Sequence, residues 1–415
     1  MRVLFINPTF PPDYTGGAEV SLRQTATGLQ KLGVDCQLLV LNNRRASEVD
    51  QWYRVETLPV RRVTVNKWMP AQEVFDPRFY KITKAQIRLA RPDIVHIHNV
   101  GNMSLAPFVA AQHEHVPLIN TLHDLWLLCP NNMRFRKDGS FCDPKQFPNG
   151  CNQCFRQYMY WGRIPKRRWV FQQLTSSVYR FVSPSQALID RHVEAGYPRQ
   201  KFQLIPYGFN EYMPSDPRDE AIAQLIRTRD EYRTIVFAGG GAINKGPQVV
   251  LDAIPQLLAK YANLRIIVTG GGEPQYLSQF RELQPQVILL SRVDPSDMRL
   301  LFSNADLTLV PSTWHENSPV VIYESFQCGT PCVGSNFGGT PELIEEDKTG
   351  YLFEVGNAAQ MAEKIVRHFQ KTPDERRIMR KQSVLSARCR LGLSQHIDSL
   401  LKLYKEAIAA RTVRG

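Results

Sequence analysis

The sequence of 415 residues has no long hydrophobic run near its start. Its opening, MRVLFINPTF, holds only a few apolar residues before polar and proline positions, which is too short for a secretion signal or a membrane span. We therefore expect a cytoplasmic protein. Internal repeats and low-complexity tracts are absent as well. Because the length exceeds what one hydrophobic core usually supports, two domains are expected.

Two common nucleotide-binding motifs are also missing. Residues 239–247, GGGAINKGP, have neither the spacing nor the following Ser or Thr of a Walker loop. Residues 11–24, PPDYTGGAEVSLRQ, place glycines before a helix without forming G-x-G-x-x-G, so NAD or FAD binding has little support. No D-x-D arrangement of the kind that holds divalent cations stands beside a predicted strand, so no catalytic metal is expected. A mononucleotide diphosphate held between two domains remains as the expected ligand.

The composition is that of an ordinary soluble globular protein, with 43% hydrophobic and 22% charged residues. Lys and Arg number 51 against 39 Asp and Glu, which gives a net charge of +12. Such a surplus suits anionic partners, namely nucleic acid, acidic lipid or phosphorylated substrates. Charge alone does not choose among them.

Short apolar runs alternate with longer amphipathic stretches in two consecutive series, as in parallel sheets covered by helices. The expected strands are RVLFIN, CQLLVL, DIVHIH, PLINTLH and RFVSPS in the first series, and TIVFAGG, RIIVTGGG, QVILLS, DLTLVPS and PCVGSN in the second. This pattern predicts an α/β protein with two Rossmann-like βαβ domains facing across a cleft, where a ligand lies at the carboxyl ends of the strands. The expected parts are residues 1–208, 209–385 and a helical tail, 386–415.

Glycines gather at three predicted strand ends. These clusters are Gly16-Gly17, Gly239 to Gly241 followed by Lys245-Gly246, and Gly270 to Gly272. Glycine lets backbone N–H groups approach a phosphate closely, and a helix N-terminus behind it favours negative charge. Glycines at strand ends also simply make turns. We favour phosphate binding for the first two clusters and a turn for the third.

Two glutamates, Glu316 and Glu324, stand eight positions apart in STWHENSPVVIYESFQCGTP. If Pro319 begins a helix, Glu324 lies more than one turn into it, in an apolar neighbourhood where a carboxylate needs hydroxyl partners such as a ribose diol. Glu316 lies in the preceding loop, beside the backbone N–H groups of Asn317 and Ser318, where a polyhydroxyl ring could be held. Alternatively, Glu316 is a solvated loop residue and Glu324 pairs with a nearby Lys or Arg.

The stretch resembles the E-x7-E signature of the retaining glycosyltransferases of family 4, which have the two-domain GT-B architecture. Further motifs of the family occur in the family's order along most of the chain. They are NPTFPPDYTGGAE, DIVHIHN, TLHDLWLLCP, FVSPSQ, IPYGFN, FAGGGAINKG, the long segment from PSTWHENSP to GGTPELI, and KTGYLF.

The resemblance implies a role for each matched position. Glu316 would lie near the donor sugar at the reaction centre, and Glu324 would bind the ribose of a nucleotide-sugar. His123 in TLHDL would hydrogen-bond a donor-sugar hydroxyl; as a lone histidine it would instead be a satisfied core residue. The first domain would take the acceptor and the second the donor. Further donor contacts would come from Gly16, Gly17, Asn317, Ser318 and Pro319.

One position departs from the family pattern. Most relatives carry an Arg and, five residues later, a Lys in the loop that binds the donor phosphates. Here Lys245 is kept, while Gly240 occupies the position of the arginine. A diphosphate that must be stabilised as the sugar bond breaks has lost one cation. We expect Arg292, in LLSRVDP, to supply it, unless the chain is a weak or inactive member.

The resemblance implies a metal-independent, retaining hexosyltransferase. UDP- or GDP-sugars would be the donors, and a glycan or a polyprenyl-diphosphate-linked oligosaccharide in cell-surface polysaccharide biosynthesis would be the acceptor. Front-face attack, with Lys245 and helix amides stabilising the nucleoside diphosphate, is favoured over double displacement. The alternative is a non-catalytic nucleotide-sugar-binding or scaffold protein of the same fold.

An insertion at about 129–170 is basic and rich in cysteine. Residues 134–168 hold nine Lys and Arg against two Asp, interleaved with Tyr and Trp, which suits an anionic membrane surface on the inner face of the cell membrane or a merely solvated face. No nucleic-acid motif accompanies the charge, so nucleic acid is not an expected partner. A structural zinc site, the one metal cofactor considered, has four candidate ligands, and the spacing is that of no standard finger. The candidates are Cys129, Cys142, Cys151 and Cys154.

Overall fold

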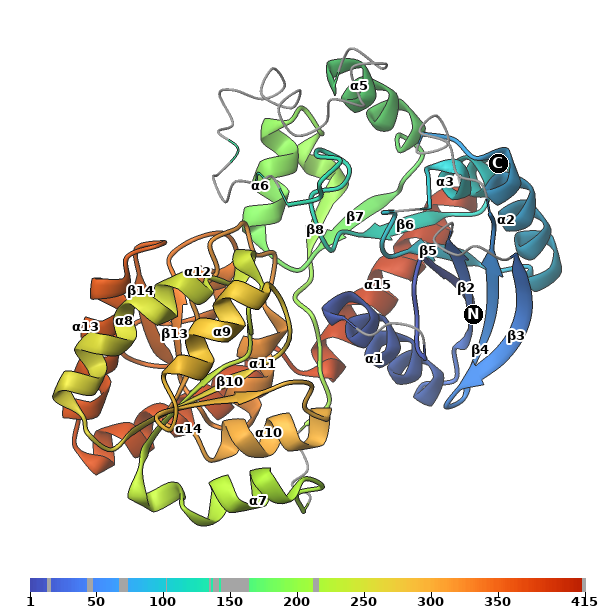
Figure 1. Cartoon of the computed structure of the whole chain (residues 1–415). Helices are drawn as coiled ribbons and strands as arrows, with labels where there is room; N and C mark the ends of the chain where they lie inside the picture. Colours follow the sequence, from blue (N-terminus) through green and yellow to red (C-terminus); the bar gives the residue numbers. More distant parts are fainter. Residues whose placement is uncertain are drawn as a thin grey trace. The chain divides into compact units, whose positions relative to one another are not determined.

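The chain folds into two compact units in a computed structural model (Figure 1). Unit 1 comprises Met1–Phe209 and Leu393–Gly415, and unit 2 comprises Asn210–Gly392. The structure describes residues 1–12, 16–42, 48–66, 74–101, 103–133, 136, 142, 164–211 and 216–412; at 164–166 and 412 it describes the backbone alone. No helix in these ranges is both long and apolar enough to cross a membrane.

Unit 1 is built around a sheet with the order β3-β4-β2-β1-β5-β6-β7-β8. Its pairs are parallel except for the hairpin of β3 and β4. The strands are β1 (Arg2–Asn7), β2 (Asp35–Asn42), β3 (Val49–Val55), β4 (Leu58–Thr64), β5 (Ile94–Ile97), β6 (Leu118–Thr121), β7 (Arg180–Ser183) and β8 (Phe202–Leu204). The helices are α1 (Gly17–Lys31), α2 (Pro77–Ala90), α3 (Ala106–His113), α5 (Ile164–Leu174), α6 (Gln186–Glu194), the 3-10 turn η4 (Arg199–Lys201) and α15 (Leu393–Thr412).

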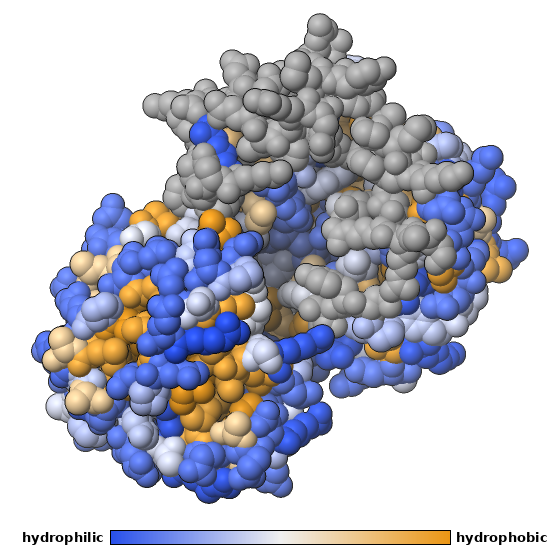
Figure 2. Space-filling model, in the orientation of Figure 1, coloured by the Kyte–Doolittle hydropathy of each residue, from blue (hydrophilic) through white to orange (hydrophobic). Residues whose placement is uncertain are grey.

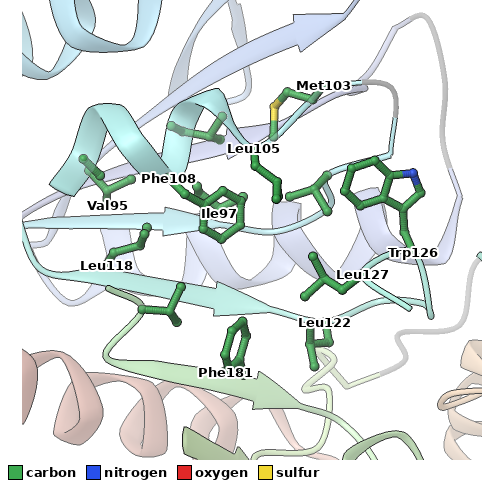
Figure 3. Packing of buried hydrophobic residues seen from close by; sticks show 14 of the residues in the cluster. Val95, Ile97, Met103, Leu105, Phe108, Leu118, Leu122, Trp126, Leu127 and Phe181 are labelled. Atoms are coloured by element: carbon green, nitrogen blue, oxygen red, sulfur yellow. The ribbon is translucent and has the colours of Figure 1, made fainter. Parts of the chain in front are cut away.

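Alternating side chains of the unit 1 sheet enter two separate cores, because successive residues of a strand point to opposite faces. From β1, Leu4 and Ile6 pack with α2, α3 and α5, whereas Val3 and Phe5 pack with α1 and α15. Figure 3 shows the first core from close by, with Phe108 of α3 facing Ile97 and neighbouring strand residues. Unit 1 is therefore a sheet with helices on both faces.

Unit 2 is built around an all-parallel sheet with the order β11-β10-β9-β12-β13-β14. The strands are β9 (Arg233–Phe237), β10 (Leu264–Thr269), β11 (Val287–Leu290), β12 (Leu307–Val310), β13 (Cys332–Ser335) and β14 (Gly350–Phe353). The helices are α7 (Glu220–Arg227), α8 (Pro247–Lys260), α9 (Pro274–Glu282), α10 (Pro295–Ser303), α11 (Val320–Gln327), α12 (Thr340–Leu343), α13 (Ala358–Gln370) and α14 (Pro373–Arg390), with the 3-10 turns η5 (Arg229–Glu231) and η6 (Ile243–Lys245). One core packs α8, α9 and α13 on the sheet, and another packs α7 and α10 on its other face.

The C-terminal residues are divided between the two units. Helix α14 ends at Arg390 in unit 2, whereas α15, red in Figure 1, belongs to unit 1. Leu400, Leu403 and Tyr404 of α15 are fully buried against α1 and the unit 1 sheet. The segment 386–415, expected as one tail, thus contributes to both units, because the apolar stripe of α15 completes one face of the first sheet.

The predicted fold class is confirmed: both units are α/β, with parallel-rich sheets and a C-terminal helix. The strand RVLFIN coincides with β1. The hairpin of β3 and β4 was not predicted, since β3 lies at the sheet edge and is mostly exposed, and β4 contains Pro59, Arg61 and Arg62.

Candidate functional site

Two loops meet at the carboxyl edge of the unit 2 sheet. Strands β9 and β12 are parallel neighbours, so the segments that follow them leave the sheet at the same edge. The N–H of Thr313 donates to the carbonyl of Asn244 (3.0 Å), which joins the two loops directly. This contact brings together Lys245 and Glu316, which are 71 positions apart in the sequence.

Lys245 and Glu316 form an ion pair with a distance of 2.6 Å between Nζ and Oε1. The hydroxyl of Ser312 donates to the same Oε1 (2.8 Å). The Glu316 side chain is 7% exposed and that of Lys245 is 36% exposed, so one side of the pair is open. Within the described residues no hydrogen bond reaches Oε2 of Glu316, which leaves this oxygen available to a ligand.

Trp314 forms a wall beside this ion pair. The ammonium of Lys245 lies 5.4 Å from the centroid of the Trp314 ring, a cation–π distance. The indole N–H of Trp314 is buried, and no acceptor for it is present in the part of the chain that the structure describes. The aromatic face and Glu316 together hold Lys245 at the edge.

The backbone of Glu316 is fixed by the loop that follows β13. The N–H of Gly339 donates to the carbonyl of Glu316 (2.8 Å). Gly338 has a φ of +61°, and a Cβ there would lie 2.5 Å from the same carbonyl oxygen. This close approach requires glycine, so the GG pair of SNFGGTPE positions Glu316.

A pocket of about 560 Å³ opens at the carboxyl ends of β9, β10 and β11 within unit 2. It contains both Glu324 and Arg292, and Arg292 is exposed. Figure 2 shows hydrophobic residues, in orange, among hydrophilic ones on the visible face of unit 2. The complete lining is Ala238, Thr269, Gly270, Gly271, Ser291, Arg292, Val293, Met298, Phe302, Val321 and Glu324.

Glu324 is the fifth residue of α11, whose N-cap is Pro319. Its side chain is partly buried, and burial raises the pKa of its carboxyl, while the charge of Arg299 opposes the shift. No hydrogen bond to this carboxylate is found among the described residues. A half-buried carboxylate without hydrogen-bond donors favours a ligand that supplies them, such as a diol.

Gly240 occupies a position where a side chain does not fit. Its φ is +51°, and a Cβ would lie 2.4 Å from the carbonyl oxygen of Gly271. The N–H of Gly241 donates to that oxygen (3.0 Å), and the N–H of Glu273 donates to the carbonyl of Gly241 (3.0 Å). The loops after β9 and β10 are therefore packed backbone to backbone, which explains why no arginine stands at 240. Gly270 to Gly272, the third glycine cluster, therefore form part of this packing between the two loops.

The segment before α11 is buried. Asn317 and Ser318 are 8% and 6% exposed, and the hydroxyl of Ser318 lies 2.6 Å from that of Tyr323. Within the described residues the N–H of Ser318 has no hydrogen-bond acceptor. An unpaired N–H ahead of a helix is suited to an anion.

In unit 1, the buried carboxylate of Glu19 holds the turn at the start of α1. It accepts the N–H of Gly16 (3.0 Å) and the hydroxyl of Thr9 (2.6 Å), and the amide of Asn7 lies 3.3 Å away. Gly17 is the first residue of the helix. Sequence reasoning passed over Glu19, although an acidic residue three positions after a helix N-cap is a capping signal.

His123, also in unit 1, has both ring nitrogens engaged. Nε2 lies 3.0 Å from Nδ1 of His98, and Nδ1 lies 2.6 Å from the hydroxyl of Tyr207. Burial lowers the pKa of His123 to about 3, and the charge of His396 adds to the shift, so the ring is neutral at pH 7. His98 was not singled out from the sequence; its own Nε2 is buried without a partner among the described residues.

The cysteine cluster lies mostly outside the described residues. Cys129 is buried and Cys142 is partly exposed, but Cys151 and Cys154 are not described, nor is most of the basic segment 134–168. In the described ranges no group of three or more His, Cys, Asp or Glu could hold a metal ion. Zinc binding and the membrane-facing surface remain predictions.

The chain is similar to known glycosyltransferases over segments of both units. The chain matches the family models of the glycosyl transferases group 1, over residues 219–383, and of glycosyltransferase family 4, over residues 15–211. It is 27% identical to spore coat protein SA of Bacillus subtilis over 200 residues, covering 43% of this chain and 53% of that protein. It is 25% identical to the D-inositol 3-phosphate glycosyltransferase of Corynebacterium kroppenstedtii over 257 residues, 58% of this chain and 56% of that one. The matches thus span about half the length of these relatives.

Solved structures share the fold over nearly the whole chain. Anabaena HepE in complex with UDP-glucose has a TM-score of 0.71 at 18% identity, covering 98% of this chain and 100% of that one. Sucrose-phosphate synthase from Thermosynechococcus elongatus has a TM-score of 0.75 at 18% identity, with 99% of each chain covered. The fold is therefore GT-B, and the chain belongs to the glycosyltransferases of group 1 and family 4.

Proposed function

We propose that the protein transfers a hexosyl group from a UDP- or GDP-sugar to a glycan or a lipid-linked oligosaccharide, with retention of configuration and without a metal. The observation that carries this proposal is the open ion pair of Lys245 and Glu316 on the same sheet edge as the pocket of Glu324 and Arg292. Family membership and the fold shared with UDP-glucose-bound HepE support it.

The nucleoside part of the donor would occupy the pocket of unit 2. Glu324 would accept hydrogen bonds from both ribose hydroxyls, which offset the desolvation that raises the pKa of its carboxyl. Arg292 would pair with the diphosphate and act in place of the arginine that Gly240 excludes. The unpaired N–H of Ser318 would add a hydrogen bond to a phosphate oxygen.

Lys245 and Glu316 would act on the bond that breaks. The diphosphate would attract the ammonium of Lys245, which then stabilises the negative charge that develops on the departing phosphate oxygen. Oε2 of Glu316 would accept a hydrogen bond from a sugar hydroxyl and orient the ring. In the front-face route, the departing oxygen accepts the proton of the acceptor hydroxyl, so no further general base is required.

His123 would hydrogen-bond a hydroxyl of the donor sugar. Because His98 and Tyr207 occupy its two ring nitrogens, one of these contacts would be exchanged for the sugar.

The biological role that we propose is cell-surface polysaccharide biosynthesis at the cytoplasmic face of the membrane. We also propose that the cysteine cluster binds a structural zinc ion.

The donor site is tested by calorimetric titration of UDP, GDP and ADP into the full chain without added metal. We expect one nucleotide to bind and Glu324→Ala to weaken it by a factor of roughly ten or more, since a carboxylate contact to a diol is lost. Glu363→Ala, a change at an exposed position of α13, is the matched control and should leave the affinity unchanged. Equal affinity of Glu324→Ala and the wild type would contradict the assignment.

Catalysis is separated from binding by Glu316→Ala. If the protein is an enzyme, the Glu316→Ala variant should still bind the nucleotide but should lose both hydrolysis and transfer of the donor sugar. A protein that binds the nucleotide-sugar but neither hydrolyses nor transfers it, with or without Glu316, would be the scaffold alternative.

A further inference from the structure

A pocket of about 680 Å³ lies in unit 1 at the amino ends of its strands, the edge opposite to that used for chemistry in sheets of this kind. It is formed where β6, β7 and β8 begin, where α3 has ended, and by the last turns of α15. The complete lining is Gln112, His115, Val116, Pro117, Leu118, Ser176, Ser177, Tyr179, Arg180, Gln200, Lys201, Ala407, Ala410 and Arg411.

The lining of this amino-edge pocket is cationic and contains no carboxylate. The cations Arg180, Lys201 and Arg411 come from β7, η4 and α15, and His115 of the loop after α3 also lines the pocket. Lys201 is engaged with the backbone, because its Nζ donates to the carbonyls of Ser176 (3.0 Å) and Val178 (2.6 Å). Because Arg180, Lys201 and Arg411 line the pocket and no Asp or Glu is among its lining residues, the electrostatic potential there favours an anion.

Arg180 and Arg411 are available to a ligand. One Nη of Arg180 donates to the carbonyl of Tyr179 (2.9 Å), and the guanidinium lies 4.7 Å from the centroid of the Tyr179 ring. Neither arginine forms an ion pair with a carboxylate in the described part of the chain. A guanidinium with unused N–H donors binds phosphate oxygens in a bidentate manner, which makes arginine well suited to this ligand.

An adjacent pocket of about 510 Å³ extends the positive surface, since it shares Val116 and Arg411 with the first. Its lining also includes Arg2, Arg88 and Arg91. Its two carboxylates, those of Asp93 and Glu114, are already engaged: Asp93 accepts the N–H of Arg2 (2.7 Å), and Glu114 pairs with Arg88 (3.0 Å) and Lys84 (3.4 Å). The four arginines of this lining, Arg2, Arg88, Arg91 and Arg411, outnumber its two carboxylates, so the adjacent pocket keeps a net positive charge.

Basic residues also collect near helix C-termini for a structural reason, because the helix dipole favours them there. Arg411 fits that explanation, but Arg180 begins a β-strand and Lys201 ends a 3-10 turn. The hydroxyl of Ser177 is a second, separate observation. Its oxygen is buried in the pocket wall and has no hydrogen-bond partner among the described residues. A ligand oxygen would satisfy this donor once the Ser177 side chain turns into the pocket.

The lining of the pocket also includes apolar residues. Val116, Pro117, Leu118 and Ala407 contribute apolar surface, and the Tyr179 ring adds an aromatic one. The volume falls in the range of small-molecule sites. We propose that this amino-edge pocket binds a phosphate-bearing ligand whose remaining part is apolar or aromatic. The phosphate contacts Arg180, Arg411 and the Ser177 hydroxyl, and the body of the ligand lies over Tyr179.

The test is calorimetric titration of the full chain with dihexanoyl phosphatidic acid, a water-soluble lipid phosphate, and with dihexanoyl phosphatidylcholine. We expect the phosphatidic acid to bind and the zwitterionic lipid to bind at least roughly tenfold more weakly, because it lacks the net negative charge. The double variant Arg180→Glu/Arg411→Glu should lose binding by a similar factor. Arg411→Ala, at an exposed position, gives a milder loss if the double variant folds poorly.

A matched control separates the pocket from general charge. Lys402→Glu/Lys405→Glu makes the same change of charge at two exposed positions of α15 that do not line the pocket. It should bind phosphatidic acid as the wild type does. Equal losses in both double variants, or no binding of the wild type to the phosphatidic acid, would overturn the proposal.

The source of the phosphate is distinguished in a second arm. Vesicles of phosphatidylcholine and phosphatidic acid at a molar ratio of about 4:1 present the headgroup in a membrane. A loss of vesicle binding in Arg180→Glu/Arg411→Glu, but not in the control, indicates a lipid ligand. Binding of dissolved dihexanoyl phosphatidic acid without binding to the vesicles indicates a soluble ligand. Glu324→Ala should not alter either result, so this pocket and the proposed donor site can fail independently.

Discussion

The two units hold their candidate residues by different means. In unit 1, buried side chains far apart in the sequence are hydrogen-bonded to one another: His123 contacts Tyr207, 84 positions away, and His96 contacts Tyr404, 308 positions away. In unit 2, glycines allow loops to approach backbone to backbone, and these loops carry the ion pair of Lys245 and Glu316. Protonation destabilises a network of buried polar groups, whereas added side-chain atoms destabilise closely packed backbone. The same layered architecture therefore has a different vulnerability in each unit.

The largest effect is expected at the ion pair of unit 2. Glu316→Gln removes the charge that holds Lys245 but keeps the shape of the side chain, so we expect kcat to fall by a factor on the order of 10³. The measurement is steady-state transfer or donor hydrolysis with the nucleotide-sugar that binds. Glu363→Gln, at an exposed position, is the control. A kcat within a factor of about three of the wild type would show that Glu316 is not part of the reaction centre.

The next effect tests the glycine contact of unit 2. Gly240→Arg restores the residue usual in the family but places a Cβ 2.4 Å from the carbonyl oxygen of Gly271 at a φ of +51°. We expect the free energy of unfolding of unit 2 to fall by roughly 2–4 kcal/mol, as measured by urea denaturation. Gly271→Ala is the control, because a Cβ at that position has nothing within 4 Å. Unchanged stability in Gly240→Arg would mean that the loops separate readily.

Low pH should destabilise unit 1 more than unit 2. Burial lowers the pKa of His123 to about 3 and of His396 to about 4, and it lowers the pKa of His96 and His98 as well. The unfolded chain therefore binds more protons than the folded chain between pH 6.5 and about 4. The free energy of unfolding decreases as the pH falls through this window. Each histidine contributes a decrease of up to about 1.4 kcal/mol for each pH unit.

Carboxyl groups oppose this trend in both units. Burial raises the pKa of Asp124 in unit 1 to about 6, which offsets about one histidine below that pH. In unit 2 the pKa of His368 is lowered to about 3, whereas that of Glu324 is raised, so the two contributions have opposite signs. Incubation at pH 7 and pH 5, followed by a brief hydrogen-exchange pulse at one common pH, should show greater loss of protection in unit 1. Equal loss in both units would contradict the comparison.

The smallest effect is expected at Tyr207. Tyr207→Phe removes the hydroxyl that lies 2.6 Å from Nδ1 of His123 and should lower the free energy of unfolding by about 1 kcal/mol. If His123 binds the donor sugar, KM should change by a few-fold, since its ring loses one restraint. Tyr232→Phe, at an exposed position, is the matched control. An unchanged stability and KM would show that Tyr207 does not position the histidine.

Much of unit 2 was predictable from sequence because its informative residues are close together. Glu316 and Glu324 are eight positions apart, and the glycines stand directly after strands, so strand periodicity located these residues and the family resemblance supplied the roles expected of the glutamates. The pairing of Lys245 with Glu316 was not predictable, since it depends on β9 and β12 being neighbours although β10 and β11 lie between them in the chain.

Less of unit 1 was predictable, because its contacts join distant segments. DIVHIHN indicated a strand, but nothing in that stretch identifies His98 as the partner of His123 or Tyr404 as the partner of His96. The edge hairpin of β3 and β4 was missed because its residues carry no clear apolar alternation.

Local order in the chain was sufficient for the α/β class, the two βα series, the family resemblance and the candidate glutamates, since periodicity and short-range spacing are properties of neighbouring residues. The order of strands in each sheet, the return of α15 to unit 1 and the exclusion of a side chain at Gly240 arose from packing. Each depends on surfaces that meet only after folding, when apolar stripes and backbone groups from distant segments find partners.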